Sequence, residues 1–406
     1  MSPVQRHLTI RSGFPDFLDL PWEVPVMEWD NCCTRLEQLP RGLSRHPVVF
    51  VNYSGKLYAI KELPVGVAQR ESEALRKMED LWLPAVTSVG YASVSTSKRE
   101  TSIIITEYLV QALPYRMLFM QSSLERYREH LLGAMAGLLV QLHLGGIFWG
   151  DCSLSNTLFL RDAGSLQAYL VDAETAEVHL PRLAPMLRFH DLEIMQVNLV
   201  TDLTNIAASG HLPQGFPISD TGDTIRRRYR DLWDEINREE IISPDESYRI
   251  QERIRSLNNL GFSVSDVDMQ PVESGNKVRF RVFVTDRNFY RDQLLSLTGL
   301  EAEEMQARQI MNEIQEIKAR LSQQNNRNMF LSAAAYYWLE NVFQPIAAQL
   351  QPLVLQGNSL PELYCQILEH KWFLSERNQH DVGHKAAVED YMHNIGNINP
   401  TPTQAS

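Results

Sequence analysis

Two carboxylates and a carboxamide lie close together in the sequence, at a spacing that could support chemistry on phosphate. Residues 150–156 read GDCSLSN, so the carboxylate of Asp151 precedes the carboxamide of Asn156 by five positions. Asp172 follows the apolar run AYLV, sixteen residues after Asn156. One carboxylate could orient an attacking hydroxyl, while the amide and the second carboxylate could hold magnesium on the phosphates. This set predicts phosphoryl transfer.

Two charged residues further upstream fit the same chemistry. Lys61 ends the run YAIK, which has the composition of a strand, and Glu71 lies ten residues further on in an expected helix. A lysine at this place can neutralise the α- and β-phosphates of a nucleotide, and a helical glutamate can hold its ammonium in position. Lys61 and Glu71 therefore extend the candidate site toward a nucleotide.

The elements that must position these residues follow from hydrophobic patterns. Residues 47–63 predict two strands around a turn at Ser54-Gly55, and residues 68–81 predict a helix that Pro84 ends. The Gly/Pro/Ser/Asp-rich stretch 209–224 predicts a connector. Between them we expect a buried strand over 101–110, a helix over 123–146, short strands over 156–160 and 168–171, and an amphipathic helix over 189–207.

The pattern changes after the connector. We expect a helix over 246–260, a hairpin over 262–285 that turns at 273–276, a helix over 301–321 and helices within 329–395. The predicted domains are a strand-rich lobe (1–110), a helical lobe with the candidate catalytic loop (111–208), the connector (209–224), an α+β segment (225–325), a helical segment (326–395) and a disordered tail (396–406).

Four short motifs occur in the order of the protein-kinase-like fold: YAIK, RESEAL around Glu71, GDCSLSN, and VDAE around Asp172. Over about residues 45–205 the chain resembles atypical bacterial members, the lipopolysaccharide-kinase and aminoglycoside-phosphotransferase branches, which carry GD…N in place of HRD…N. The whole chain also resembles a bacterial domain-of-unknown-function family associated with those kinases. The resemblance implies an α+β fold, with a two-lobed kinase-like domain, then an α/β hairpin-containing segment and a helical C-terminal region.

The resemblance also implies ATP and magnesium, and a role for each matching residue. Glu107, Tyr108 and Leu109 fall in the hinge that binds adenine through backbone groups. Glu174 adds a carboxylate beside the metal position and is a candidate further ligand. The remaining roles are the phosphate lysine for Lys61, its helical partner for Glu71, the catalytic aspartate for Asp151, and metal ligands for Asn156 and Asp172.

The chain departs from the kinase pattern at three places. No GxGxxG precedes Lys61, and residues 40–46 (PRGLSRH) form the only loop in the right place, where Arg41, Arg45 or backbone amides could take over. Trp149-Gly150 replaces His-Arg, Ala173-Glu174 replaces Phe-Gly, and no APE motif follows. We therefore expect no regulation of the eukaryotic protein-kinase type.

Composition limits the class of protein. With 38 basic and 50 acidic residues the net charge is −12, which argues against nucleic acid as a partner. The four cysteines form neither a disulfide framework nor a zinc-site spacing. The most apolar stretch, Gly133–Phe148, is too short and too polar for a transmembrane segment, and the N-terminus lacks a signal-peptide pattern. We expect a cytoplasmic protein.

Three other features have a structural interpretation that we prefer. Arg226–Arg230 is followed by acids at helical spacing, which predicts pairing within the helix rather than a nucleic-acid site. His380 and His384, with His370 upstream, have a spacing that can bind metal but lie in polar surroundings typical of surface histidines. Cys152 has no basic neighbour in sequence, which favours packing over reactivity.

The first functional hypothesis is an ATP- and magnesium-dependent phosphotransferase that acts on a hydroxyl of a small molecule, a lipid glycan or a protein. The alternative is a nucleotide-binding pseudokinase whose C-terminal half binds a partner protein, since the Gly-rich loop is missing. A third hypothesis, nucleotidyl transfer, would use the same residues.

Overall fold

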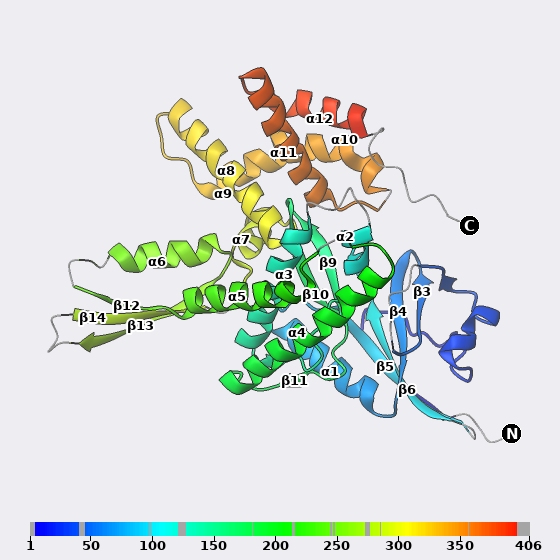
Figure 1. The fold of residues 1–406 in the computed structure, drawn as a ribbon. Helices are drawn as coiled ribbons and strands as arrows, with labels where there is room; N and C mark the ends of the chain where they lie inside the picture. Colours follow the sequence, from blue (N-terminus) through cyan, green and yellow to red (C-terminus); the bar gives the residue numbers. More distant parts are fainter. Residues whose placement is uncertain are drawn as a thin grey trace. The chain divides into compact units, whose positions relative to one another are not determined.

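The strand pair predicted over residues 47–63 is present in the computed structural model as β3 (Val48–Tyr53) and β4 (Lys56–Leu63). Gly55, in the turn between them, has a φ of +86°, which glycine adopts without steric cost. The pair lies in a six-stranded antiparallel sheet with the order β1-β5-β6-β4-β3-β2 (Figure 1). The other strands are β1 (Gln5–Ile10), β2 (Leu36–Glu37), β5 (Ser88–Ser95) and β6 (Glu100–Glu107).

The chain divides into two compact units. Unit 1 comprises residues 1–160, 166–241 and 266–286, and unit 2 comprises 161–165, 242–265 and 287–406. The structure describes residues 5–39, 45–96, 99–120, 127–180, 182–212, 216–243, 246, 248–272, 277–284, 286–355 and 357–395. Arg41, the predicted turn at 273–276 and the predicted tail at 396–406 lie outside the described residues.

Because side chains alternate along β4, Lys61 lies on the face of the sheet where the candidate site forms. Ile60 belongs to a core with Trp22 and Trp29, which the segment between β1 and β2 contributes. Because successive strand residues point to opposite faces, Lys61 points to the other face. There α1 (Val67–Asp80) packs on β5 and β6 and carries the buried Glu71. The predicted helix over 68–81 and strand over 101–110 are confirmed as α1 and β6.

The helical part of unit 1 is built around α3 (Arg128–Leu144). Most residues of this helix between Leu131 and His143 are buried. It ends at Gly145-Gly146, where Gly146 has a φ of +75° and an added Cβ would lie 2.5 Å from the carbonyl oxygen of His179. The other elements are η1 (Val26–Asn31), β7 (Leu113–Pro114), α2 (Tyr115–Met120), β8 (Ile147–Phe148), β9 (Thr157–Asp162), β10 (Ser165–Leu170), β11 (Glu177–Val178), α4 (Pro185–Ala208) and α5 (Ile218–Asn237).

The division of the chain differs from the predicted connector at 209–224. Its second half is already the first part of α5, which packs on α3 and α4 within unit 1. The Gly/Pro/Ser/Asp-rich composition was misleading because Thr221 and Gly222 are buried as small helical residues. Ile225 and Tyr229 continue the same buried face, so tertiary packing favours a helix here.

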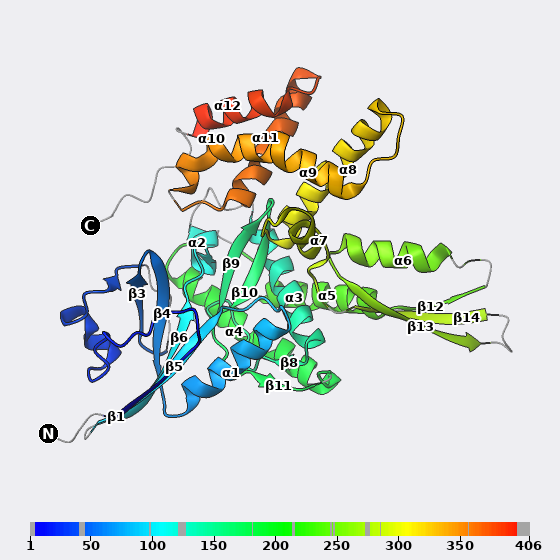
Figure 2. The same ribbon diagram turned by 180° about the vertical axis from the view of Figure 1, so that it is seen from behind.

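The predicted hairpin over 262–285 forms β13 (Val264–Val272) and β14 (Lys277–Val284), to which β12 (Glu239–Ile242) adds a third strand in the order β12-β14-β13 (Figure 2). Phe280 and Val282 of β14 are buried, as their alternation predicts. The helix predicted over 246–260 is α6 (Tyr248–Asn259).

The remaining helices of unit 2 surround a core that includes Trp338 and Tyr364. They confirm the predicted helical C-terminal region, and the whole arrangement is the predicted α+β fold. In the part of the chain that the structure describes, no helix is long and apolar enough to cross a membrane. These helices are α7 (Phe289–Thr298), α8 (Glu304–Gln324), α9 (Leu331–Trp338), a π-helical turn (Leu339–Phe343), α10 (Gln344–Val354), α11 (Leu360–Asn378) and α12 (Gly383–Ile395).

Candidate active site

Lys61 brings together two of the carboxylates singled out in the sequence. Its Nζ lies 2.9 Å from Glu71 Oε1 and 3.1 Å from Asp172 Oδ1. Only 11 % of the Lys61 side chain is exposed, so the ammonium depends on these two partners. Burial alone would lower the pKa of Lys61, but the two carboxylates outweigh it and raise the pKa. Lys61 is therefore a fixed positive charge.

The carboxylate of Glu71 has hydrogen-bond partners on β4 and on the segment that follows β10. Besides Lys61, its Oε1 accepts the backbone N–H of Ala173 at 3.3 Å, next to Asp172. Burial raises the pKa of Glu71 to about 7, although Lys61 draws it down. Its Oε2 is buried without a hydrogen-bond partner among the described residues. Glu71 thus links α1 to the segment that carries Asp172.

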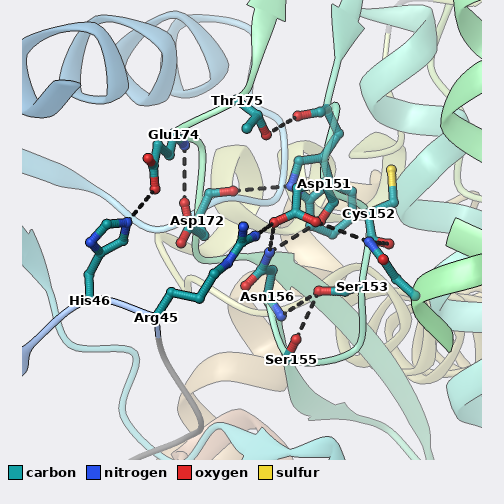
Figure 3. Close-up of polar contacts among 12 residues, drawn as sticks. Arg45, His46, Asp151, Cys152, Ser153, Ser155, Asn156, Asp172, Glu174 and Thr175 are labelled. Atoms are coloured by element: carbon teal, nitrogen blue, oxygen red, sulfur yellow. Dashed lines mark hydrogen bonds and ion pairs between the residues drawn. The ribbon is translucent and has the colours of Figure 1, made fainter. Parts of the chain in front are cut away.

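Asp151 and Asn156 form a second group, on the loop between β8 and β9 (Figure 3). Asn156 Nδ2 donates to Asp151 Oδ2 at 3.1 Å and to the Asp151 carbonyl at 3.2 Å. Asn198 of α4 donates to Asp151 Oδ1 at 3.0 Å and to the Cys152 carbonyl at 3.1 Å. Each carboxylate oxygen of Asp151 therefore has an amide donor that fixes its direction.

Trp149 connects the Asp151 loop to the Asp172 segment. Its indole Nε1 donates to the carbonyl of Asp172 at 3.1 Å, and its own carbonyl accepts the hydroxyl of Thr175 at 2.8 Å. At the next residue, Gly150 has a φ of +78°, and a Cβ there would lie 2.9 Å from the Thr175 carbonyl. The two segments thus approach too closely for any residue but glycine.

Asp191 of α4 binds the backbone at the start of the Asp151 loop. It is fully buried, and its two oxygens accept the backbone N–H groups of Trp149 and Gly150, each at 2.8 Å. His143 lies 3.1 Å from Asp191 Oδ2 and 2.8 Å from the hydroxyl of Tyr229 on α5. Burial lowers the pKa of His143, so the neutral ring donates to Asp191 and accepts from Tyr229.

A second aspartate of α4, Asp202, fixes the other end of the loop. Its Oδ2 accepts the backbone N–H groups of Leu154 at 3.0 Å and Ser155 at 3.2 Å. Sequence reasoning missed Asp191, Asn198 and Asp202, although it predicted their helix. A signal was present, because both aspartates lie on the apolar stripe of α4, where a charged side chain is rare unless it has a buried partner.

Two consecutive basic residues that precede β3 reach the site. Arg45 forms an ion pair with Asp151, and His46 Nε2 lies 3.1 Å from Glu174 Oε2 (Figure 3). The Glu174 side chain therefore points to His46, while its backbone N–H donates to Asp172 Oδ1 at 3.1 Å. Arg45 belongs to the stretch 40–46 that the sequence predicts in place of a Gly-rich loop, whereas His46 was not singled out in the sequence.

The predicted hinge residues follow the end of β6. The N–H of Glu107 donates to Thr87 and that of Tyr108 to Leu57, so both are used within the strand-rich part. The N–H of Leu109 has no backbone acceptor among the described residues. The ring of Tyr108 packs edge-on against Phe50 of β3, with the ring centroids 5.3 Å apart. Of the three residues, Leu109 is thus the one whose backbone N–H could donate a hydrogen bond to an adenine.

The residues predicted to bind magnesium offer suitable atoms. Asn156 donates through Nδ2, which leaves Oδ1 to face a cation, and the contacts of the Asp172 carboxylate described above all involve Oδ1. Carboxylate and amide oxygens are the ligands that magnesium prefers. No group of three or more His, Cys, Asp or Glu side chains among the described residues could hold a metal ion alone. Phosphate oxygens would have to complete the shell, as is usual for magnesium at nucleotide sites.

The other features from the sequence have structural partners. Arg226 donates to Gln196 of α4 and Arg228 contacts Glu129 of α3, so they pair with neighbouring helices rather than within α5 as predicted. Cys152 is fully buried, and burial raises the pKa of its thiol, which supports a packing role. Of the three histidines, His384 contacts Glu313, His370 contacts Asp390 and His380 contacts the Asn378 carbonyl.

Comparisons with known protein families give matches in two segments of the chain. Residues 53–210 match the Lipopolysaccharide kinase (Kdo/WaaP) family, and residues 231–395 match the Domain of unknown function (DUF4032). A search of the curated proteins finds no match. A solved structure of WaaP in complex with acyl carrier protein aligns at 16 % identity and a TM-score of 0.37, over 62 % of this chain and 98 % of that one. The predicted resemblance is confirmed: the chain combines a kinase-like fold with a domain of unknown function.

Proposed function

We propose that this protein is an ATP- and magnesium-dependent phosphotransferase that acts on a hydroxyl group. The observation that supports this most is Lys61, held between Glu71 and Asp172 beside the loop that carries Asp151 and Asn156. A structural ion pair would need only one carboxylate. A lysine with two, one of them at a candidate metal position, fits a cation that binds phosphates.

Each residue has a distinct part in this proposal. Lys61, kept in place by Glu71, binds the α- and β-phosphates, while the backbone of residues 107–109 holds the base. Asn156 and Asp172 would hold magnesium, which when bound neutralises charge on the phosphates. Glu174 would become a further ligand if its carboxylate turned from His46 to the metal. Asp151 accepts and orients the attacking hydroxyl, and its two amide donors keep its carboxylate in that direction.

The acceptor is proposed from the family match. The matched family is named for lipopolysaccharide kinases, so a sugar hydroxyl on a lipid glycan is the first acceptor to test. Soluble sugars, other small molecules and protein hydroxyls follow. We expect the protein to lie in the cytoplasm, where ATP is available. We also propose that its C-terminal half binds a partner protein.

The test measures binding and transfer separately. Calorimetry with Mg·ATP is run on wild type and Asp151→Asn, followed by phosphate transfer from radiolabelled ATP to panels of sugars, glycolipids and proteins. We expect similar ATP affinity in both proteins, with transfer reduced about 10²–10⁴-fold in the variant, the range for a positioned base. A wild type that does not bind Mg·ATP would exclude this function.

A pseudokinase is the second candidate, because two observations favour it. The first is that Arg45 forms an ion pair with the carboxylate of Asp151. The second is that the sequence has no GxGxxG motif before Lys61. ATP binding without transfer to any acceptor, and without hydrolysis above the level of Asp151→Asn, would support the pseudokinase. The α-label of ATP distinguishes the third hypothesis, since nucleotidyl transfer moves that label to the acceptor and phosphoryl transfer does not.

A further inference from the structure

We propose that Arg45 is a phosphate-binding residue that alternates between Asp151 and the terminal phosphate of the nucleotide. This rests on the proposed function and concerns a place where the chain lacks the usual phosphate-binding loop. In the structure Arg45 Nη2 contacts Asp151 Oδ2, the same oxygen that accepts from Asn156. Figure 3 shows the side chain of Arg45 extended toward this carboxylate.

The position of Asp151 indicates which phosphate Arg45 can reach. A carboxylate that accepts the proton of an attacking hydroxyl must lie within hydrogen-bond distance of that hydroxyl, whose oxygen in turn lies about 3–3.5 Å from the transferred phosphorus. A guanidinium in contact with Asp151 is therefore next to the transferred phosphate, which is the terminal one. Arginine suits this role because its fork of N–H groups can bind two phosphate oxygens together.

The exposure of the pair favours the exchange. The Arg45 side chain is 80 % exposed and that of Asp151 is 23 % exposed, so the guanidinium approaches from solvent. Exposed ion pairs contribute little to stability, whereas a phosphate carries more negative charge than a carboxylate. A bound nucleotide can thus draw Arg45 away from Asp151 without disturbing buried structure.

The exchange would have a consequence for the acceptor. With Arg45 in place, both Asp151 oxygens are engaged, by Asn156 and Arg45 on Oδ2 and by Asn198 on Oδ1. When Arg45 moves to the phosphate, Oδ2 becomes available for the attacking hydroxyl. Oδ2 of Asp151 would then accept the hydroxyl when a nucleotide triphosphate is bound and Arg45 has moved to it.

The experiment compares Arg45→Ala with wild type by calorimetry, using Mg·ATP and Mg·ADP. Arg45→Ala should bind ATP about tenfold or more weakly, with ADP affinity nearly unchanged, because ADP lacks the terminal phosphate. Arg45→Lys should lie between the two, since lysine keeps the charge but not the fork. Arg230→Ala is the matched control, because it removes the same charge from an exposed position of α5.

A second measurement follows Asp151 directly in the full-length protein. Carbodiimide labelling of carboxyl groups, read by mass spectrometry, should modify Asp151 more in Arg45→Ala than in wild type without nucleotide. A non-hydrolysable ATP analogue at saturating concentration should remove this difference.

Several results would overturn the inference. Equal weakening of ATP and ADP would place Arg45 on an inner phosphate. Tighter ATP binding in Arg45→Ala would make Arg45 only an inhibitory contact, and unchanged affinity for both nucleotides would exclude any phosphate contact. If wild type itself binds neither nucleotide, the proposed function fails and this inference fails with it, whereas the other outcomes leave the proposed function intact.

Discussion

At the scale of single residues, Lys61 is the side chain whose loss should have the clearest effect on nucleotide binding. It is nearly buried and forms ion pairs with two carboxylates, those of Glu71 and Asp172. Lys61→Ala should lower the affinity for Mg·ATP about tenfold to a hundredfold, the cost of a lost charge-assisted contact. Calorimetry measures this, and an unchanged affinity would mean that Lys61 is a structural residue only. Lys77→Ala, a partly exposed lysine of α1, is the control.

Asp172 should determine the magnesium dependence rather than the nucleotide affinity as such. Its Oδ1 is engaged by Lys61 and by the N–H of Glu174, so the position of its carboxylate is fixed before a metal arrives. In Asp172→Asn we expect ATP binding to need a higher magnesium concentration and transfer to be abolished. Magnesium titrations at constant ATP test this, and identical titration curves for variant and wild type would refute the assignment.

At the scale of elements, α4 is the helix that shapes the candidate catalytic loop. It contributes Asp191 at one end of the loop, Asn198 at Asp151 and Asp202 at the other end. None of these residues needs to touch a substrate. Their side chains provide hydrogen-bond partners for backbone groups of the loop, which is irregular and cannot pair these groups within itself. The loop is thereby kept in one conformation.

Asp191→Asn tests this role of α4. One oxygen of the carboxylate becomes an NH₂ group that faces a backbone N–H of Trp149 or Gly150, so a buried donor loses its acceptor. We expect the free energy of unfolding to fall by about 2–3 kcal/mol and transfer to decline more than ATP affinity. Urea unfolding and calorimetry measure the two effects. Glu193→Gln, on the exposed side of the same helix, should change neither.

At the scale of the whole molecule, unit 1 extends beyond the predicted end of the helical lobe at residue 208. The helix α5 covers α3 with Ile225 and Tyr229, and Tyr229 completes the hydrogen-bond chain to His143. A fragment that ends at residue 208 should therefore expose apolar surface of α3 and aggregate or melt without cooperativity. A fragment that ends at residue 286 keeps all of unit 1 and should melt cooperatively. Circular dichroism distinguishes these outcomes.

The stability of unit 2 should decline as pH rises from about 5 to about 8. Asp162 accepts the N–H groups of Met305 and Gln306, and Glu304 accepts those of Tyr290 and Arg291. Burial raises the pKa of Asp162 to about 7 and that of Glu304 to about 8. The folded state therefore binds protons more tightly than the unfolded state, so the stabilisation is complete at acid pH and is lost as pH passes through these values.

Urea unfolding between pH 5 and pH 8.5 checks this dependence. Asp162→Asn and Glu304→Gln should each flatten it, because the substituted side chain no longer titrates. Glu301→Gln, an exposed residue just before α8, should leave the slope as in wild type. A wild-type stability that stays flat or rises over this range would contradict the raised pKa values of Asp162 and Glu304.

Local sequence patterns predicted most of the elements around the candidate site and pointed to the residues proposed for it. The hairpin that carries Lys61, the helix with Glu71 and the loop from Asp151 to Asn156 were all predicted, because each depends on residues within a short stretch. A strand has a period of two and an amphipathic helix a period of about 3.6, and both periods are visible without knowledge of the rest of the chain. The order of the motifs then identified the kinase-like fold.

Contacts between residues far apart in the chain could be found only in the folded structure. Arg45 contacts Asp151 from 106 positions away, and Asp191 reaches the loop from 41 or more positions further along the chain. The folded structure also decided that α5 belongs to unit 1, against the composition of its first residues. A buried aspartate or a connector rich in small residues has several local interpretations. Only the packing around it determines whether its polar groups find partners, and that packing depends on contacts between segments far apart in sequence.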